Sequence, residues 1–269
     1  QPKNGFYDLV NAMVSLGKSL GVDYKVNHDL QRIDIKNKKV SSLIFKQKQI
    51  NCDIVISGAD YHHTESLLPK NFRQYSEKYW KNRVFAPSSL LYYVGFNTKI
   101  NKVQHHNLFF DTNFDKHAEE IYDNPKWPTD PLFYANFTSK TNPKTAPLNC
   151  ENGFFLIPIA TDLEDTKEIR EKYFNIIIEK LELYTGQSLK ESIIYKKSFC
   201  VSDFKKEYNS YGGNAYGLAN TLFQTAFLRP NIKSKMVQNL YFCGQLTVPG
   251  PGVPPAIVSG ELVANLINK

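Results

Sequence analysis

The sequence of 269 residues predicts an α/β protein with a sheet-rich middle region. Apolar residues recur at helical spacing near both ends of the chain, and apolar runs with the length of single strands lie beside them. Aromatic residues make up 13% of the chain, with 18 Phe and 16 Tyr, and most lie between residues 70 and 235. Because aromatic side chains are enriched in strands, the middle region is predicted to hold most of the sheet.

The first predicted element is an amphipathic helix over residues 6–20. Its apolar positions recur every three or four residues, and they are Phe6, Leu9, Val10, Met13, Leu16 and Leu20. Gly21 follows as the expected stop, because glycine readily adopts the left-handed conformation that ends many helices.

Short strands are predicted next, at residues 22–26, 30–35 and 40–45. The polar tract at residues 36–39 predicts a hairpin turn between the last two. Residues 53–57 form a short apolar run that ends at a glycine. Such a run is typical of a buried strand in a parallel sheet.

The middle region is predicted to contain strands at residues 90–96, 132–137 and 153–159, with one long helix over about residues 165–183. The density of Phe, Tyr and Leu at residues 85–155 suits an apolar tunnel for a long apolar ligand, or simply a packed core. The residues alone leave both interpretations open.

The end of the chain, like its beginning, is predicted to combine a short strand with an apolar helix. A strand is predicted at residues 239–243, a Gly/Pro-rich loop follows, and a Pro-Pro pair opens a helix that runs to residue 267. We therefore expect two regions, one built from residues 1–66 and 236–269 and the other from residues 67–235.

Charge and composition exclude several classes of protein. The chain has 33 Lys and Arg against 26 Asp and Glu, a net charge of +7, but only five of the basic residues are Arg. Because Arg is the usual reader of base edges and phosphates, no nucleic-acid partner is expected. Mean hydropathy is −0.40, and no run approaches the ~18 apolar residues of a membrane-spanning helix.

The four cysteines lie far apart and form no C-x-x-C pair. A disulfide scaffold or a zinc site is therefore not expected, and a reducing cytoplasm fits best. The chain begins at Gln1 without a Met or a signal peptide, so we expect a processed or truncated piece of something longer.

Three short motifs are interpreted as structural. Gly17-Lys18-Ser19 is similar to the end of a phosphate-binding loop, but it lies inside the first predicted helix, and Ala12 stands at the required first glycine. The histidine pairs at residues 62–63 and 105–106 seldom suit one ion, because adjacent side chains point apart. No metal site is predicted, and no catalytic residue follows from spacing.

The segment with a chemical signature is residues 241–256, YFCGQLTVPGPGVPPA. Gly250 and Gly252 let the backbone approach a flat or bulky ligand, and Pro254 suits the first turn of a helix. The positive end of that helix and free amides stabilise a ligand that gains negative charge, as a flavin does when it accepts hydride. The alternative is a loop that only caps a packing helix.

This segment resembles the C-terminal flavin-binding signature of the phytoene-desaturase-like flavoproteins, which are carotenoid desaturases and isomerases related to amine oxidases. Similar residues extend over nearly the whole chain. They include Gln1-Pro2-Lys3-Asn4-Gly5, residues 20–27, residues 53–60 (DIVISGAD), residues 105–110, residues 130–134 and Arg229-Pro230.

The resemblance implies a fold and a set of cofactor contacts. It implies a partial FAD-binding, Rossmann-like domain together with a substrate domain that has a mixed or antiparallel sheet. It places at the flavin ring Gly244, Gln245, Gly250, Gly252, Val253 and Pro254. It also places Leu30 at the adenine.

Two departures from the family pattern matter. The G-x-G-x-x-G fingerprint is absent, so the ADP-binding unit is expected to belong to a missing N-terminal half of the enzyme. Gln245 is an amide, whereas many amine-oxidase relatives carry an acidic residue nearby to hold the ribityl chain.

The implied activity is FAD-dependent dehydrogenation of a long lipophilic polyene, and the signature is closer to hydroxycarotenoid 3,4-desaturases than to phytoene desaturases. Because a polyene dissolves in lipid, the protein is expected to be cytoplasmic and to work at a membrane surface. The alternatives are a retinol-saturase-like reductase, an amine oxidase, a non-catalytic carotenoid- or lipid-binding module, and a purely structural partner.

Overall fold

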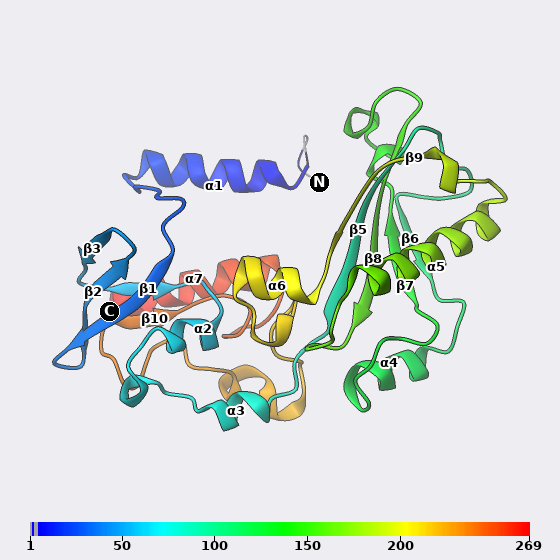
Figure 1. Ribbon diagram of the computed structural model, residues 1–269. Helices are drawn as coiled ribbons and strands as arrows, with labels where there is room; N and C mark the ends of the chain where they lie inside the picture. The colour runs from blue at the N-terminus through cyan, green and yellow to red at the C-terminus, as the bar shows by residue number, and fades with distance from the viewer. Residues whose placement is uncertain (1, 3–4) are drawn as a thin grey trace.

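The computed structural model describes residue 2 and residues 5–269 (Figure 1); the rest of the N-terminal motif, Gln1, Lys3 and Asn4, lies outside the described residues. Its α-helices are α1 (Tyr7–Ser19), α2 (Tyr61–Ser66), α3 (Glu77–Lys81), α4 (Phe114–Tyr122), α5 (Lys167–Thr185), α6 (Val201–Tyr208) and α7 (Val253–Ile267). Its strands are β1 (Leu30–Lys36), β2 (Lys39–Phe45), β3 (Lys48–Asn51), β4 (Val55–Ser57), β5 (Ser88–Phe96), β6 (His106–Phe109), β7 (Phe133–Asn136), β8 (Glu151–Ile159), β9 (Ile193–Phe199) and β10 (Leu240–Phe242). The predicted mixed α/β class is confirmed.

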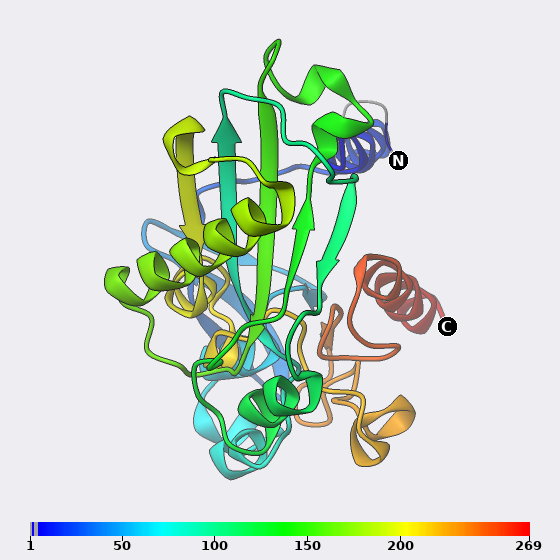
Figure 2. The same ribbon diagram turned by 90° about the vertical axis from the view of Figure 1, so that its right-hand side faces the viewer.

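The largest sheet has five strands in the order β6-β7-β8-β5-β9. All neighbouring strands run antiparallel, so the sheet expected to be mixed or antiparallel is antiparallel throughout. Helix α5 covers one face (Figures 1 and 2). Its Phe174 and Ile177 share a buried cluster with Tyr92, Phe155 and Ile157 of the sheet. The strands and the long helix predicted for the middle region are confirmed to within two residues at each end.

The opposite face of this sheet stays partly open. Strand pairing places Leu91 opposite Leu156 and Tyr93 opposite Phe154, and the side chains of these residues alternate with those that face α5. Tyr93 is 43% exposed, and Tyr195 on the neighbouring strand β9 is 55% exposed. A large, partly apolar face of this kind marks a surface for a ligand or a partner.

A second core forms around two parallel strands, where Leu240 of β10 pairs with Val55 of β4. The ring of Tyr61, at the start of α2, stacks on that of Phe242 with 3.7 Å between their centroids. Trp80 of α3 is 1% exposed in the same cluster. The core thus joins segments that lie far apart in the sequence.

A three-stranded antiparallel sheet, β1-β2-β3, lies beside this second core. The predicted turn at residues 36–39 is confirmed, with Asn37 and Lys38 at φ of 51° and 57°. Positive φ at both central residues is the geometry of a tight two-residue hairpin. Strand β3, with the sequence KQIN, was not predicted because it is short and mostly polar.

Two strand predictions need correction. The strand predicted at residues 22–26 is wrong, because no regular element occurs there. A strand needs a neighbour for its backbone N–H and C=O groups, and no strand of the described chain pairs with this stretch. The run at residues 53–57 forms only the short strand β4, and Ile56 is 50% exposed, because two strands alone leave one face uncovered.

The predicted N-terminal helix is confirmed as α1, and Gly21 follows it with φ of 84°. No residue of α1 is buried, and Met13 and Leu16 of its apolar face are 49% and 61% exposed. Figure 1 shows α1 apart from the other helices, so its apolar stripe is a second open surface. Within the described residues, no helix combines the length and the apolar character needed to cross a membrane.

Glu65 makes the stability of this fold depend on pH. Its side chain is buried and accepts N–H bonds from Gln74 at 2.7 Å and Tyr75 at 3.3 Å. Burial raises the pKa of Glu65 from 4.5 to about 7, although both hydrogen bonds act in the opposite direction. Because the pKa is higher in the folded state, deprotonation disfavours folding. The free energy of unfolding should therefore fall, by about 3 kcal/mol, as the pH rises through the interval between these two values.

We expect Glu65→Gln to flatten this part of the stability profile, measured by urea unfolding at a series of pH values. Glu77→Gln is the matched control, because the Glu77 side chain is 63% exposed, and it should keep the wild-type slope. A Glu65→Gln protein with an unchanged slope would contradict the prediction.

Candidate functional site

The candidate site lies where the two parallel strands end. Strands β4 and β10 run side by side up to the pair Ser57 and Phe242, and the N–H of Cys243 donates to the Ser57 carbonyl at 2.9 Å. Gly58 and Gly244 follow directly. Ligands of open α/β sheets bind beyond the carboxyl ends of the strands, so both glycines occupy the expected position.

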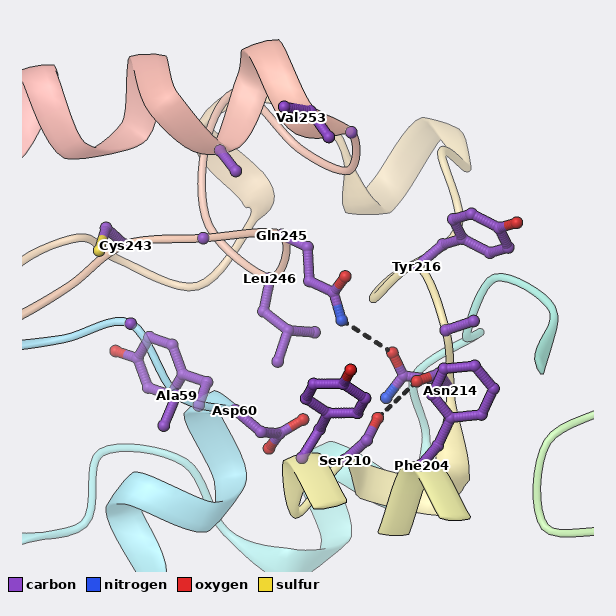
Figure 3. Close-up of a pocket in the computed structure, with 17 residues that line it drawn as sticks. Ala59, Asp60, Phe204, Ser210, Asn214, Tyr216, Cys243, Gln245, Leu246 and Val253 are labelled. Atoms are coloured by element: carbon purple, nitrogen blue, oxygen red, sulfur yellow. Dashed lines mark hydrogen bonds between the residues drawn. The ribbon is translucent and has the colours of Figure 1, made fainter. Parts of the chain in front are cut away.

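The N-terminus of α7 faces the same place (Figure 3). Gly252 precedes the helix with φ of 117°, a conformation that favours glycine. Pro254 and Pro255 have no N–H, and the N–H of Ala256 donates to the Gly252 carbonyl at 2.9 Å. Of the first-turn amides, the Val253 N–H is therefore the one that remains for a ligand.

Buried hydroxyl groups hold the loop after β10 in place. The Gly244 N–H donates to Ser259 Oγ at 2.8 Å, and Ser259 Oγ donates to the Ala256 carbonyl at 2.6 Å. Thr247 Oγ1 donates to the Gly244 carbonyl at 2.9 Å. Ser259 and Thr247 are both 0% exposed, so α7 and the loop form one rigid unit.

These segments enclose a cavity of about 570 Å³. Four parts of the chain line it: the end of β4, helix α6 with the turn that follows it, the loop after β10, and the start of α7. The lining residues are Gly58, Ala59, Asp60, Tyr61, Phe204, Tyr208, Ser210, Asn214, Ala215, Tyr216, Cys243, Gly244, Gln245, Leu246, Gly252, Val253 and Ala256. A cavity of this size suits a small molecule or the ring system of a cofactor.

Asn214 connects the two sides of the cavity. It is 1% exposed, and its Oδ1 accepts from the Gly217 N–H at 2.7 Å and from Gln245 Nε2 at 3.3 Å (Figure 3). A side chain at Gly217 would lie 2.9 Å from the Gln245 carbonyl. The Gln245 amide is therefore oriented by a tightly packed neighbour.

Asp60 is a carboxyl group in the lining. Its two oxygens accept the N–H groups of His63 and Tyr211, both at 3.1 Å. Burial raises the pKa of Asp60, and these hydrogen bonds act in the opposite direction. Since both oxygens already hold backbone groups, we assign Asp60 to the framework of the site and not to proton transfer.

The structure brings together four of the seven residues predicted to contact the cofactor: Gly244, Gln245, Gly252 and Val253 all line the cavity. Gly250 instead lies against Arg229, whose guanidinium would be 3.2 Å from a side chain at this position. Pro254 follows Val253 in α7, outside the lining, and Leu30 begins β1 at the edge of the second core.

Sequence reasoning missed several lining residues, among them Asp60, Phe204, Ser210, Asn214 and Tyr216. Asp60 ends the DIVISGAD motif, which was interpreted only as a strand. The others lie in or near a Gly-Gly turn far from the signature, and no local pattern links them to it. Within the described residues, no group of His, Cys, Asp and Glu is arranged to hold a metal ion.

Comparison with protein families decides the class of this protein. The model of the family described as flavin containing amine oxidoreductase matches residues 1–268. The chain belongs to this family. The resemblance drawn from the glycine–proline signature is thereby confirmed.

Curated relatives of this family member are carotenoid enzymes. The carotenoid 3,4-desaturase of Haloarcula japonica is 40% identical over 267 residues, which are 99% of this chain and 54% of that protein. The 1-hydroxycarotenoid 3,4-desaturase of a Flavobacterium species is 27% identical over the same shares. The 4,4'-diapophytoene desaturase (4,4'-diaponeurosporene-forming) of Staphylococcus haemolyticus is 30% identical over 97% of this chain and 54% of that protein. The chain thus spans about half the length of the curated relatives that it matches.

Solved structures support the fold. An oxidoreductase from Methanosarcina mazei has a TM-score of 0.63 at 13% identity, over 99% of this chain and 55% of that chain. A putrescine oxidase variant has a TM-score of 0.57 at 12% identity, over 96% and 52% of the two chains. At such identities, the likeness concerns the fold alone.

Ser259→Ala tests the fastening of the loop to α7. The change leaves the partly buried Gly244 N–H without its acceptor at the fully buried position 259, so we expect the free energy of unfolding to fall by about 1–3 kcal/mol. Ser19→Ala is the control, since Ser19 also bonds a carbonyl three residues earlier, but on an exposed helix; it should cost less than about 0.5 kcal/mol. Equal effects in urea unfolding would refute the prediction.

Proposed function

We propose that this chain is the C-terminal portion of an FAD-dependent oxidoreductase that desaturates a carotenoid or a related polyene. The observation that carries the proposal is the cavity beyond β4 and β10, lined by the signature residues Gly244, Gln245, Gly252 and Val253. Membership of a flavin-containing family and 40% identity to a carotenoid 3,4-desaturase support the same assignment.

The residues around the cavity fit a flat ring that gains negative charge. Gly58 and Ala59 are exposed at the end of β4, and Gly244 and Gly252 offer backbone without side chains. A bound FAD would supply a hydride acceptor at this place. The Val253 N–H and the positive end of α7 would stabilise the charge that results.

We assign the seven predicted contacts as follows. Gly244, Gln245, Gly252 and Val253 would hold the ring. Gly250 and Pro254 would shape the loop and the first turn of α7 around it, and Leu30 would lie at the adenine. Gln245 would contribute an uncharged amide, held in orientation by Asn214.

The pyrophosphate of FAD needs a binding turn that this chain does not contain. A pyrophosphate is usually held by a glycine-rich turn at a helix N-terminus in a βαβ unit, and no G-x-G-x-x-G motif occurs in the sequence. We propose that residues 1–66 and 236–269 belong to the FAD domain and residues 67–235 to the substrate domain. The N-terminal half of the enzyme would complete the cofactor site.

The open face of the five-stranded sheet suits a polyene. It borders a second cavity of about 940 Å³, lined in part by Tyr93, Phe154 and Tyr195. The rings of Tyr93 and Phe154 lie 5.3 Å apart, and Gly95 lines the same cavity without a side chain. A conjugated chain can lie against such an aromatic surface with little loss of its own conformational entropy.

We also propose that the enzyme is cytoplasmic and takes its substrate at a membrane surface. A polyene resides in lipid, and the net charge of +7 favours an anionic bilayer.

The complete enzyme with FAD should convert a carotenoid into a product with one more double bond and a longer absorption wavelength. The assay offers four substrates separately: phytoene, a hydroxycarotenoid, retinol and a primary amine. Turnover of retinol or of the amine in place of both carotenoids would refute the proposed function.

Gly252→Val tests the ring assignment. Valine is strained at a φ of 117°, and its β-carbon would lie 3.3 Å from the Pro255 ring, so the purified enzyme should lose its flavin absorbance. Ala256→Phe, which fills the cavity without straining the backbone, should have the same effect. Gly260→Ala is the control, because nothing lies within 4 Å of the added atom. Normal flavin content in both cavity variants would refute the assignment.

The isolated 269-residue chain should bind FAD poorly and lack activity, because the pyrophosphate would have no glycine turn to bind it. Calorimetric titration of FAD into the purified chain tests this directly. Submicromolar affinity, or desaturation by the chain alone, would contradict the prediction.

A further inference from the structure

Residues 218–229 expose three large apolar side chains within six positions of the sequence. Leu222 and Phe223 are 79% and 75% exposed, and Phe227 is 88% exposed. They lie on two successive 3₁₀ turns, Leu222–Gln224 and Ala226–Leu228. We call these three residues the apolar tip; an exposed group of this kind on a folded protein marks an interaction surface.

Buried polar side chains hold the segment that carries the apolar tip. Gln224 is 3% exposed; it donates to the Val84 carbonyl at 2.7 Å and accepts from the Val84 N–H at 2.9 Å. Arg229 is also 3% exposed and donates to Asn220 Oδ1 at 2.6 Å and to the Leu218 carbonyl at 3.2 Å. The apolar tip is therefore presented by a fixed framework and not by a loose loop.

The same framework connects the apolar tip to the candidate site. Arg229 Nη1 donates to the Gln245 carbonyl at 3.3 Å, and the guanidinium packs beneath Gly250. Whatever the apolar tip contacts is thus held at a constant position relative to the cavity.

The charge of the segments that adjoin the apolar tip in the sequence, and of the segment bonded to Gln224, indicates the partner. No Asp or Glu occurs anywhere between Tyr208 and Gly260, although the chain as a whole has 26. Lys81 and Arg83 precede Val84, to which the segment is bonded, and Lys233 and Lys235 follow it in the sequence. A group of large apolar side chains in a stretch without carboxylates is complementary to an anionic lipid surface.

We propose that Leu222, Phe223 and Phe227 insert into the surface of an anionic bilayer and dock the enzyme there. The proposal rests on the proposed function, in which the substrate is a polyene taken from lipid. Docking through a segment bonded to Gln245 would hold the cavity at a constant height above the bilayer.

The test uses the complete enzyme that carries this chain and vesicles of phosphatidylcholine with or without phosphatidylglycerol. We expect the triple variant Leu222→Ser, Phe223→Ser and Phe227→Ser to lose about tenfold or more in vesicle binding by co-sedimentation, since each residue removes apolar surface from the bilayer. The control is Leu148→Ser with Leu183→Ser, at positions 90% and 87% exposed elsewhere on the molecule, and it should bind as wild type.

A second measurement separates docking from catalysis. The triple variant should desaturate substrate offered in detergent at the wild-type rate and lose activity only with substrate offered in vesicles. If the wild type does not desaturate substrate in detergent, the proposed function is wrong. The docking proposal is then still decided by the vesicle-binding measurement alone. If the triple variant binds vesicles as wild type does, or if the wild type ignores them, the docking proposal is overturned.

The docking proposal would also be overturned if a protein surface, and not a bilayer, covers the apolar tip. If the triple variant changes the mass of the enzyme in solution from dimer to monomer without changing vesicle binding, the apolar tip joins two copies. If the side chains of Phe223 and Phe227 are shielded from hydroxyl-radical labelling in the complete enzyme without vesicles, the remaining half of the enzyme covers them.

Discussion

The parallel pairing of β4 with β10 is the contact on which the site depends. Their ends are joined by the bond from the Cys243 N–H to the Ser57 carbonyl, across 186 positions of the chain. Three residues of each strand take part, and such short strands are not stable alone. Packing of Tyr61 on Phe242 and burial of Trp80 supply the apolar contact that holds the pair. Loss of this pairing would separate Gly58 from Gly244, and the cavity would no longer exist.

Buried polar side chains then set the shape of the cavity. Ser259 ties Gly244 to α7, Asn214 orients Gln245, and Arg229 holds the Gln245 carbonyl from the other side. A buried polar group costs free energy unless it is paired. These bonds therefore define one arrangement of the loop, whereas apolar contacts alone would tolerate several.

The open apolar surfaces of the chain have a common physical meaning. The uncovered face of the large sheet, the stripe on α1 and Ile56 of β4 all present side chains that an isolated domain would bury. The sheet face borders a cavity and suits a ligand, while α1 and β4 are elements of the proposed FAD domain. This pattern agrees with a chain that spans about half the length of its curated relatives.

The sequence by itself determined the elements whose signals are local. Helical periodicity located α1 and α5, the polar tract at residues 36–39 located the hairpin, and the glycine–proline signature located both the family and the start of α7. These signals are complete within a few turns of chain, because helix periodicity and turn chemistry depend on neighbouring residues. Only the tertiary structure decided that residues 22–26 form no strand, that β4 is half open, and that Asn214 and Asp60 belong to the cavity. Whether a strand forms, and which residues meet across 31 or 186 positions, depends on the neighbours that folding supplies, and no local pattern records them.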